Sequence, residues 1–462
     1  MIEVNNVSFI YKNEVEKQIS NITFNVSKGN LILLCGKSGC GKSTVAKLLN
    51  GLIPNFVEGD FSGKVKIKGR ETKQIEMYEL AETVGSVFQN PKTQFFNLDT
   101  DGELYFGLEN KGEELSTASR RVNGVIEELS IKDLLNRKVF ELSGGEKQVL
   151  AIASVYATNP DIYVFDEPSA NIDKIGITKI RNILQHIKSQ GKTVIIAEHR
   201  LYYIMDLIDK AVYLEDGKIN KIYLGDEFRN IDDKQRKEMG LRSFEATLSN
   251  DLVTDFEYCQ KDELLIKDLS YCKRDNFILK GINLSANKGD IIGITGSNGV
   301  GKSTLGKCIC GLLKESGGGI LYKGKKVTYK KRLEICYMVM QDVVHQLFAN
   351  SVIEEFNIID KKISTNTITD VLEEVNLSEY KNKHPLCLSG GQMQRLAVAT
   401  GIFSNKDIMI FDEPTSGLDY ANMIEISNLI KKISDNKIIF IITQDDEFLL
   451  HCCTKKINLD LP

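Results

Sequence analysis

In each half of the sequence, a pair of adjacent carboxylates directly follows a strand-like apolar run. Asp166 and Glu167 form the first pair, and Asp412 and Glu413 form the second. Beside a bound nucleotide, one acid of such a pair can hold Mg²⁺ through its water shell, while the other accepts a proton from, or orients, the attacking water. We therefore expect Asp166 and Asp412 at the metal, with Glu167 and Glu413 as catalytic residues.

A glycine-rich loop precedes each acid pair, between an apolar run and a helical stretch. Gly36–Thr44 and Gly296–Thr304 both fit the phosphate-loop pattern. Backbone N–H groups of such a loop cradle phosphates, the lysine reaches the terminal phosphates and the following hydroxyl binds Mg²⁺. Ser43 and Ser303 are the expected metal-binding hydroxyls. The expected nucleotide-binding residues are Gly36, Ser38, Gly39, Gly41, Lys42, Ser43 and Thr44 in the first loop, and Gly296, Asn298, Gly299, Gly301, Lys302, Ser303 and Thr304 in the second.

A second glycine motif, Leu142–Gln148, returns as Leu388–Gln394. Two glycines at a loop-to-helix corner allow an anion to approach the unpaired N–H groups of a helix N-terminus. Each corner lies roughly a hundred residues downstream of the phosphate loop of its own half, so we expect it to serve the nucleotide of the other half. The residues expected at the phosphate are Ser143, Gly145, Ser389 and Gly391.

Single polar residues at strand ends complete each set. Gln89 and Gln341 could help position magnesium or water, and His199 could donate a hydrogen bond to a γ-phosphate oxygen. Taken alone, a loop glutamine or a histidine after a strand is more often structural. The second half has Gln444 in place of the histidine, an amide that can donate a hydrogen bond but cannot become a cation. We therefore expect the second site to be the weaker catalyst.

Strand-forming runs must position these side chains. Residues 2–9 and 19–35 predict strands broken by a turn at Ser27–Asn30, and residues 101–135 predict a small helical subdomain whose exposed face could bind a partner.

The whole plan then repeats at an offset of about 245 to 260 residues, which indicates duplication of an entire domain. The predicted domains are residues 1–225 and 263–462, joined at 226–262 by a linker with some helix.

Composition limits the class of protein. A chain of 462 residues can form two sizeable cores, and its net charge of −4 does not indicate bulk attraction to nucleic acid. The ten cysteines show neither metal-ligand spacing nor a disulfide framework, as is typical of a reducing cytoplasm. The apolar runs are of strand length, so we expect no membrane-spanning segment and no secretion signal.

The ordered motifs resemble those of the ATP-binding cassette ATPases over nearly the whole chain apart from the linker. Five motifs each occur twice, which makes the likeness specific. The details look closest to the ATPase subunits of energy-coupling factor importers, with both cassettes fused. Asn50–Asn55, Val87–Pro91 with the trailing Gln94, Glu198–Arg200 and Val339–Val343 carry that finer resemblance.

The resemblance implies an α/β fold of two P-loop cassettes. Each would have a RecA-like α/β core, an antiparallel β subdomain and a helical signature subdomain. It implies ATP and Mg²⁺ as cofactors and an intramolecular head-to-tail sandwich of the cassettes, with no further homo-oligomer needed. The first site would join Lys42, Ser43, Gln89, Asp166, Glu167 and His199 to Ser389 and Gly391, and the second would join Lys302, Ser303, Gln341, Asp412 and Glu413 to Ser143 and Gly145.

The two halves depart from the family pattern at two places. Tyr11 fits the aromatic residue that stacks on adenine in the first half, whereas the family register puts Lys273 or Tyr271 there in the second. Val149 stands where many family members carry arginine, and Arg395 keeps that arginine in the other copy.

Two functions from different classes fit these motifs. The first is a transport motor at the cytoplasmic face of the membrane. The resemblance implies a transmembrane coupling subunit and a substrate-binding membrane subunit as its partners, for uptake of a vitamin, a vitamin precursor or a transition-metal ion. The second is a soluble tandem-cassette ATPase acting on ribosomes or nucleic acid.

Two features weigh against the second function. The linker of about 37 residues lacks a long basic hairpin, and the sequence lacks the cysteine clusters of zinc modules. We therefore expect no nucleic-acid partner. A nucleotide-dependent scaffold without turnover is disfavoured because Glu167, Glu413 and His199 are present.

Overall fold

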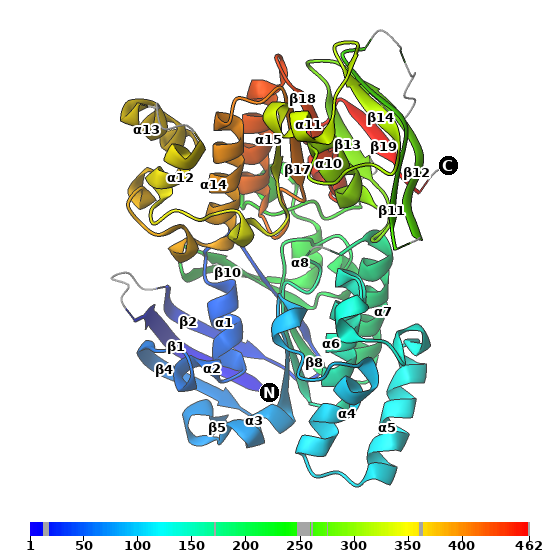
Figure 1. Ribbon diagram of the computed structural model, residues 1–462. Helices are drawn as coiled ribbons and strands as arrows, with labels where there is room; N and C mark the ends of the chain where they lie inside the picture. Colours follow the sequence, from blue (N-terminus) through cyan, green and yellow to red (C-terminus); the bar gives the residue numbers. More distant parts are fainter. Residues whose placement is uncertain are drawn as a thin grey trace. The chain divides into compact units, whose positions relative to one another are not determined.

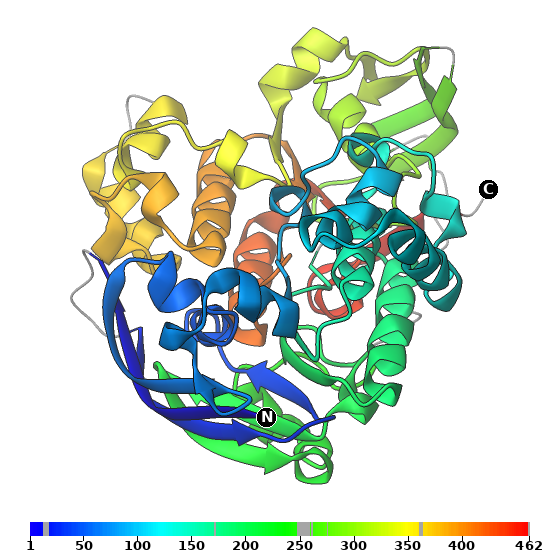
Figure 2. The same ribbon diagram turned by 90° about the horizontal axis from the view of Figure 1, so that it is seen from below.

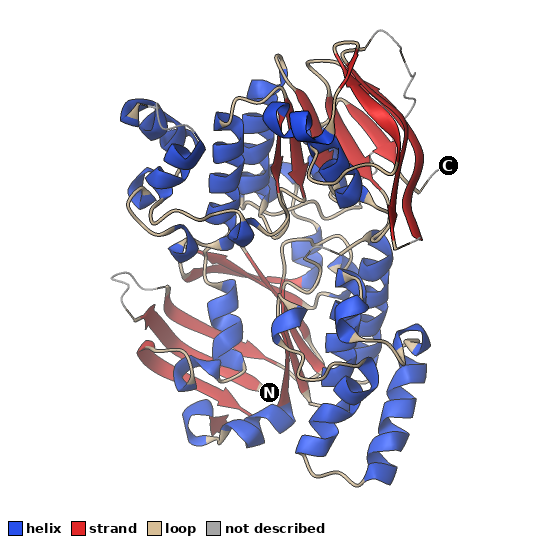
Figure 3. Ribbon diagram, in the orientation of Figure 1, coloured by secondary structure: helices blue, strands red, loops and turns tan. Residues whose placement is uncertain are grey.

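The computed structural model describes residues 1–12, 18–170, 172–246, 259, 262–274, 276–359 and 364–460. The chain divides into two compact units, Met1–Ala246 and Thr247–Pro462. Each unit contains a mainly parallel sheet, a smaller antiparallel sheet and a group of helices, as Figures 1 and 3 show. This architecture confirms the predicted α/β fold class.

The antiparallel sheet of the first unit has the strand order β2-β1-β4-β5. Its apolar face is made by alternating residues such as Val4 and Phe24, which pair across β1 and β2 and are buried. The strands are β1 (Ile2–Tyr11), β2 (Ile19–Val26), β4 (Gly59–Ile67) and β5 (Arg70–Glu71).

The larger sheet of the first unit has the order β10-β9-β3-β8-β7-β6, in which only the β9–β10 pair is antiparallel. Its central strands are apolar throughout because helices cover both faces. Ile32 and Leu34 of β3 pack in one core with α1, and Leu31 and Leu33 pack in the other with α6 and α7. The strands are β3 (Leu31–Cys35), β6 (Val84–Val87), β7 (Ile162–Asp166), β8 (Thr193–Ala197), β9 (Lys210–Glu215) and β10 (Lys218–Leu224).

The helices of the first unit include the predicted helical subdomain. The prediction for residues 101–135 corresponds to α4 and α5, which lie beside α6 in Figure 1. The helices are α1 (Lys42–Leu49), α2 (Leu52–Asn55), α3 (Met77–Thr83), α4 (Thr100–Asn110), α5 (Leu115–Glu128), α6 (Gly144–Ala157), α7 (Lys174–Ser189), α8 (Gly225–Arg229) and α9 (Asp233–Glu238).

The first unit continues beyond residue 225, where the sequence prediction ends the first domain. Phe228, Met239 and Leu241 are buried in its core, so residues 226–246 belong to this unit instead of forming a free linker. The sequence prediction ended the domain too early because these apolar residues lie on either side of the mixed-charge run of α9, which on its own is typical of a linker. Residues 247–258 and 260–261 of the predicted linker lie outside the described residues.

The second unit repeats this plan. Its antiparallel sheet has the order β12-β11-β14-β15, and its parallel sheet has the order β16-β17-β18-β13-β19. In both Figure 1 and Figure 2 the yellow helices α12 and α13 lie on the opposite side of the orange-red core from the light-green antiparallel sheet.

The strands of the second unit are β11 (Leu264–Lys273), β12 (Asn276–Ala286), β13 (Ile291–Thr295), β14 (Gly317–Tyr322), β15 (Lys325–Lys326), β16 (Cys336–Val339), β17 (Ile408–Asp412), β18 (Ile438–Ile442) and β19 (Lys455–Asn458). Its helices are α10 (Lys302–Cys310), α11 (Tyr329–Ile335), α12 (Val352–Ile359), α13 (Thr365–Glu374), α14 (Gly390–Phe403), α15 (Tyr420–Ser434) and α16 (Asp446–Cys452). Among the described residues, none of the helices combines the length and the apolar character needed to cross a bilayer.

Candidate functional site

The first phosphate loop connects β3 to α1. Gly41 caps the helix with φ +104°, and a Cβ there would lie 2.5 Å from Ile19 Cγ2, so the loop requires glycine at this position. Lys42 is 4% exposed, and its Nζ donates to the carbonyls of Gly36 and Lys37, each at 3.0 Å. The loop therefore folds around its own lysine, with the N–H groups of the first turn of α1 available for phosphate.

Two hard oxygen donors meet beside this loop. Ser43 Oγ donates to Asp166 Oδ1 at 2.9 Å, which joins the start of α1 to the end of β7. Burial raises the pKa of Asp166, although the Ser43 hydrogen bond and the charges of Lys47 and Lys42 oppose that rise. A buried carboxylate beside a hydroxyl suits Mg²⁺, which prefers oxygen ligands and would offset the cost of burying the charge. The residues present therefore fit the expected metal.

Glu167 lies at the centre of the first site. Its Oε2 accepts a hydrogen bond from Gln89 Nε2 at 2.7 Å, and its backbone N–H donates to the carbonyl of Ala197 at 2.8 Å. Its φ of +46° is a left-handed conformation that non-glycine residues seldom adopt and that clusters at functional sites. Burial raises the pKa of Glu167 to about 8, with the nearby Glu198 and Asp166 acting in the same direction.

His199 faces Glu167 from the end of β8. Its Nε2 lies 3.5 Å from Glu167 Oε1, and the side chain is 8% exposed. Burial, together with the positive charges of Lys42 and Arg242, holds the pKa of His199 well below its ordinary value. The imidazole is therefore neutral, and the contact with Glu167 is a polar contact instead of an ion pair.

Glu198 organises this side of the site, and the sequence analysis missed that role. Its carboxylate is buried and accepts from the backbone N–H groups of Ser169 (3.3 Å), His199 (2.7 Å) and Arg200 (3.0 Å), and from the Tyr203 hydroxyl (2.8 Å). It thereby fixes the segment that holds His199 and ties it to the loop after the acid pair. The carboxylate at the end of a buried strand was visible in the sequence, but its partners were not.

The second unit repeats the loop and the metal pair. Lys302 Nζ donates to the carbonyls of Gly296 at 2.7 Å and Ser297 at 2.9 Å. Burial raises the pKa of Asp412, and a hydrogen bond from Ser303 opposes that rise. Glu413 has φ +49°, and its N–H donates to the Ile442 carbonyl at 2.8 Å. The backbone of the predicted catalytic glutamate is therefore held in the same way in both units.

The side chains that face the two glutamates differ. Thr443 Oγ1 donates to Glu413 Oε2 at 3.0 Å, and Gln444 Nε2 donates to the carbonyl of Gly296 in the phosphate loop. In the first unit, the position that corresponds to Gln444 is occupied by His199, which lies beside Glu167. Gln341 lies exposed after β16, as Gln89 does after β6. The weaker activity of the second site stays a prediction, since these contacts describe the resting geometry.

The two glycine corners are helix N-termini, as predicted. Ser143 caps α6 in a capping box with Glu146, and Ser389 caps α14 in the same way with Gln392. Gly145 and Gly391 follow in the first turn, where backbone N–H groups lack partners within the helix. The pairing of each corner with the nucleotide of the other half remains a prediction.

Tyr11 lies at the end of β1, where its hydroxyl is 3.0 Å from Thr44 Oγ1. This contact places the ring beside the phosphate loop, which suits the predicted adenine stacking. In the second unit Lys273 ends β11 as Tyr11 ends β1, whereas Tyr271 packs part-buried against the core. The position that corresponds to Tyr11 is therefore that of Lys273.

The difference between Val149 and Arg395 has a local structural basis. Val149 is buried in the core of the first unit, whereas Arg395 Nη1 forms an ion pair with Glu425 Oε2 at 3.2 Å on α15 of the second. Val149 of α6 therefore packs in the core, whereas Arg395 of α14 pairs with the neighbouring helix.

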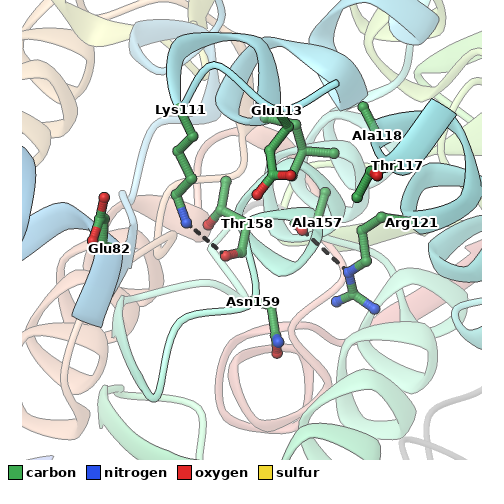
Figure 4. A pocket seen from close by; sticks show the side chains of 10 residues that line it. Glu82, Lys111, Glu113, Thr117, Ala118, Arg121, Ala157, Thr158 and Asn159 are labelled. Atoms are coloured by element: carbon green, nitrogen blue, oxygen red, sulfur yellow. Dashed lines mark hydrogen bonds between the residues drawn. The ribbon is translucent and has the colours of Figure 1, made fainter. Parts of the chain in front are cut away.

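A pocket of about 500 Å³ lies at the C-terminal end of α6 (Figure 4). Lys111 Nζ donates to the carbonyl of Thr158 at 2.8 Å, and Arg121 Nε donates to that of Ala157 at 3.1 Å. These cations satisfy the last carbonyls of α6 and complement its dipole, so their contacts are those of helix capping. The pocket is lined by Glu82, Leu108, Lys111, Glu113, Thr117, Ala118, Arg121, Ala157, Thr158 and Asn159.

Comparison with known proteins gives a consistent picture. The ABC transporter family pattern matches residues 19–170 and 279–416, which include both phosphate loops, both glycine corners and both acid pairs. A Treponema denticola protein described as an ABC transporter ATP-binding protein is 44% identical over 471 residues, covering 99% of this chain and 95% of the relative. A second protein of that species with the same description is 39% identical over 467 residues, covering 100% and 95%.

Solved structures resemble the chain over both units. The crystal structure of an archaeal ribosome recycling factor, in complex with the ribosomal stalk protein aP1, has a TM-score of 0.63 at 23% identity. The likeness covers 97% of this chain and 86% of that one. At this identity the likeness concerns the fold.

Proposed function

The chain belongs to the ABC transporter family and is an ATPase. From this premise we propose that it is the motor subunit of a membrane importer of the energy-coupling factor type. In this proposal it works at the cytoplasmic face of the membrane. A transmembrane coupling subunit and a substrate-binding membrane subunit carry the solute, which is a vitamin, a vitamin precursor or a transition-metal ion. The descriptions of its relatives as ABC transporter ATP-binding proteins support a transport role.

The observation that carries the proposal is an exposed apolar segment that follows Gln89 in the sequence of the first unit. Phe96 is 74% exposed and Leu98 is 79% exposed. They follow Gln94, whose side chain accepts from the Phe88 N–H at 3.2 Å and donates to the Ser86 carbonyl at 3.2 Å. Exposed apolar side chains grouped in this way are typical of protein–protein contact.

The second unit repeats this device. Phe348 is 75% exposed and follows Gln346, whose side chain accepts from the Met340 N–H at 3.0 Å and donates to the Met338 carbonyl at 2.9 Å. We name Phe96, Leu98 and Phe348 the docking residues. In each unit, Gln94 or Gln346 joins the start of this exposed segment to the strand that precedes Gln89 or Gln341, so a partner bound there can sense the nucleotide site.

We propose a chemistry for the first site that its contacts support. ATP phosphates bind the N–H groups of the loop and Lys42. Glu167 orients and deprotonates the attacking water, while the neutral His199 donates its N–H to a γ-phosphate oxygen. Ser43, Asp166 and Gln89 would hold Mg²⁺. When bound, this ion would neutralise part of the phosphate charge.

We also propose that each glycine corner closes the nucleotide site of the other half. Ser389 and Gly391 would complete the first site, and Ser143 and Gly145 the second. The capped N-termini of α6 and α14 support this assignment, because the dipole and free N–H groups of a helix N-terminus favour an anion.

A second candidate is a soluble tandem-cassette ATPase that acts on ribosomes or nucleic acid. It is favoured by the likeness of fold to the ribosome recycling factor, which extends over both units. The exposed docking residues favour the importer, since they provide each unit with a surface for a separate apolar partner.

The experiment that tests the importer is purification of the tagged full-length chain from detergent-solubilised membranes, with identification of the attached proteins. Two integral membrane proteins are expected to co-purify. They should be lost from the variant with Phe96→Ser and Phe348→Ser, and retained in the control Phe56→Ser, which alters a residue that is 68% exposed elsewhere on the first unit. Recovery with ribosomes and without a membrane protein would favour the second candidate.

A further inference from the structure

A buried threonine of the second unit contacts the glutamate that is predicted to be its catalytic base. Thr443 directly follows β18, and 0% of its surface is exposed. Its Oγ1 donates a hydrogen bond to Glu413 Oε2 at 3.0 Å. The backbone of Thr443 is held as well, because its N–H donates to the carbonyl of Ile294 in β13 at 3.2 Å. The hydroxyl therefore reaches the carboxylate from a fixed position at the end of the sheet.

The Thr443 hydroxyl has a single proton, and the groups around it decide where that proton points. The N–H of Asp445 donates to Thr443 Oγ1 at 3.1 Å, so the hydroxyl oxygen already accepts one hydrogen bond. Its own proton is directed to Glu413, because an ionised carboxylate can only accept. Threonine is also branched at Cβ, which restricts its side-chain rotamers. Both the place and the direction of the donor to Glu413 are therefore fixed.

Asp445 is held in turn by two other parts of the second unit. Its Oδ2 accepts from Thr415 Oγ1 at 3.0 Å, and its Oδ1 accepts from the N–H of Phe448 at 3.1 Å, as the N-cap of α16. Asp445 and Thr415 are both buried. Thr415 lies two residues after Glu413, in the loop that follows the acid pair. These contacts join the segment after β18 to the loop that carries the glutamate.

The first unit has a different residue at this position. The N–H bonds of the two glutamates to Ala197 and Ile442 show that Glu198 corresponds to Thr443. Glu198 acts as an acceptor toward the groups around it. The first glutamate is faced by His199 instead, whose Nε2 lies 3.5 Å from its carboxylate. Each unit thus places a neutral polar group against its glutamate, but takes that group from a different position in the chain.

We propose that Thr443 is a positioning residue of the second nucleotide site. Its hydroxyl holds the Glu413 carboxylate in the orientation from which the glutamate acts on the attacking water, so the second unit positions its base without a histidine. A base must lie within hydrogen-bond reach of the proton that it takes, and a fixed carboxylate meets this condition more often than a rotating one. The proposal rests on the role proposed for Glu413 and is independent of whether the chain drives transport.

The test is steady-state ATP turnover by the full-length protein in a Glu167→Gln background, where the second site supplies the remaining activity. Thr443→Val keeps the shape of the side chain and removes the hydroxyl. It should lower kcat about tenfold and change the KM for ATP by less than about twofold, because the hydroxyl acts on the glutamate in the proposed role. Thr443→Ser keeps the hydroxyl and should retain most of the kcat.

Thr415→Val is the matched control, since it removes another buried hydroxyl of the same network and leaves the bond from Thr443 to Glu413 in place. It should lose less kcat than Thr443→Val. Equal losses in these two variants would mean that packing of the network determines the rate. That result, an unchanged kcat in Thr443→Val, or an equal loss in Thr443→Ser would overturn the proposal.

Two further measurements separate this proposal from the chemistry proposed for the site. The double variant Glu167→Gln, Glu413→Gln gives the turnover without either glutamate. If the Glu167→Gln protein is no faster than this double variant, Glu413 is not a base and both proposals fail. Calorimetric unfolding checks that the Thr443 variants fold. If Thr443→Val does not, Thr443→Ser and Thr443→Ala give the same comparison, because they differ from each other only in the hydroxyl.

Discussion

At the scale of single residues, the two units hold the glutamates proposed as catalytic in the same backbone conformation and surround them with different side chains. Glu167 and Glu413 share a left-handed backbone and an N–H bonded to the neighbouring strand. His199 contacts the first glutamate, and Thr443 contacts the second. The difference lies in the side chain that can donate to the γ-phosphate, so the two sites are expected to differ in rate more than in architecture.

We expect His199→Ala to lower ATP turnover much more than Gln444→Ala. The imidazole touches Glu167, whereas the amide donates to the Gly296 carbonyl. Loss of a donor to the transition state costs about 10² to 10³ in kcat. Steady-state phosphate release by the full-length variants measures the difference, and a larger loss in Gln444→Ala would contradict the assignment of the faster site.

Sequence reasoning predicted which residue types serve the sites, and the structure brings several of them together. Ser43 meets Asp166, and Gln89 meets Glu167, although these residues are far apart in the sequence. Their spacing within repeated motifs made this inference possible. Glu198 could not be assigned in this way, because its role depends on tertiary partners that no local pattern marks.

At the scale of elements, the joint between the helical subdomain and the core differs between the units. Glu128 of α5 lies 3.4 Å from His186 Nε2 of α7 and accepts a hydrogen bond from the Tyr156 hydroxyl of α6. Glu374 of α13 pairs with Lys432 of α15 at 2.6 Å in the second unit. The same joint is therefore made by a histidine network in one unit and by a permanent cation in the other.

We expect Glu128→Gln to destabilise the first unit in a pH-dependent way. Burial opposes the shift, but hydrogen bonds from Tyr156 and His186 hold the pKa of Glu128 below its ordinary 4.5. The ionised carboxylate therefore stabilises the folded unit above pH 4.5, and this contribution is lost as the pH falls through the lower folded pKa. The loss at pH 7 should be about 1 kcal/mol or less, since the side chain is 35% exposed and screened by water.

Calorimetric unfolding of the full-length protein between pH 7 and pH 3.5 checks this expectation. The difference between wild type and Glu128→Gln should narrow below pH 4.5. Glu374→Gln is the matched control for the same joint in the second unit. A difference for Glu128→Gln that grows toward acid pH would show that the sign is wrong.

The strands and the helical subdomain were predictable from their apolar periodicity, because each buries a face against a neighbour. The end of the first unit was not predictable. Phe228 and Leu241 are separated by the charged α9, and their burial depends on packing against strands far earlier in the chain. The mixed-charge sequence of α9 therefore gave no sign that this helix packs on the first unit and ends beside the phosphate loop.

At the scale of the whole molecule, we propose one chain with two unequal ATP sites and with docking residues in both units. The duplication explains why the fold repeats, whereas the side chains that contact the two glutamates differ, His199 in the first unit and Thr443 in the second. The proposed exchange of glycine corners connects the two sites in function.

If each corner serves the other half, Ser389→Arg should reduce turnover at the first site, and Ser143→Arg should affect the second. Both substitutions remove one capping serine, at a cost of about 1 kcal/mol, so their effects on stability are matched. With the first site as the faster one, Ser389→Arg should therefore lose more phosphate release than Ser143→Arg. The reverse order would indicate that each corner serves its own half.

The central claim is that hydrolysis depends chiefly on the first site. Its most direct test compares ATP turnover by Glu167→Gln and Glu413→Gln in the full-length protein, with phosphate release measured under saturating ATP and Mg²⁺. Loss of the catalytic base should cut turnover by about 10² or more in Glu167→Gln, while Glu413→Gln keeps a substantial fraction of it. Equal losses in the two variants, or a greater loss in Glu413→Gln, would contradict the account.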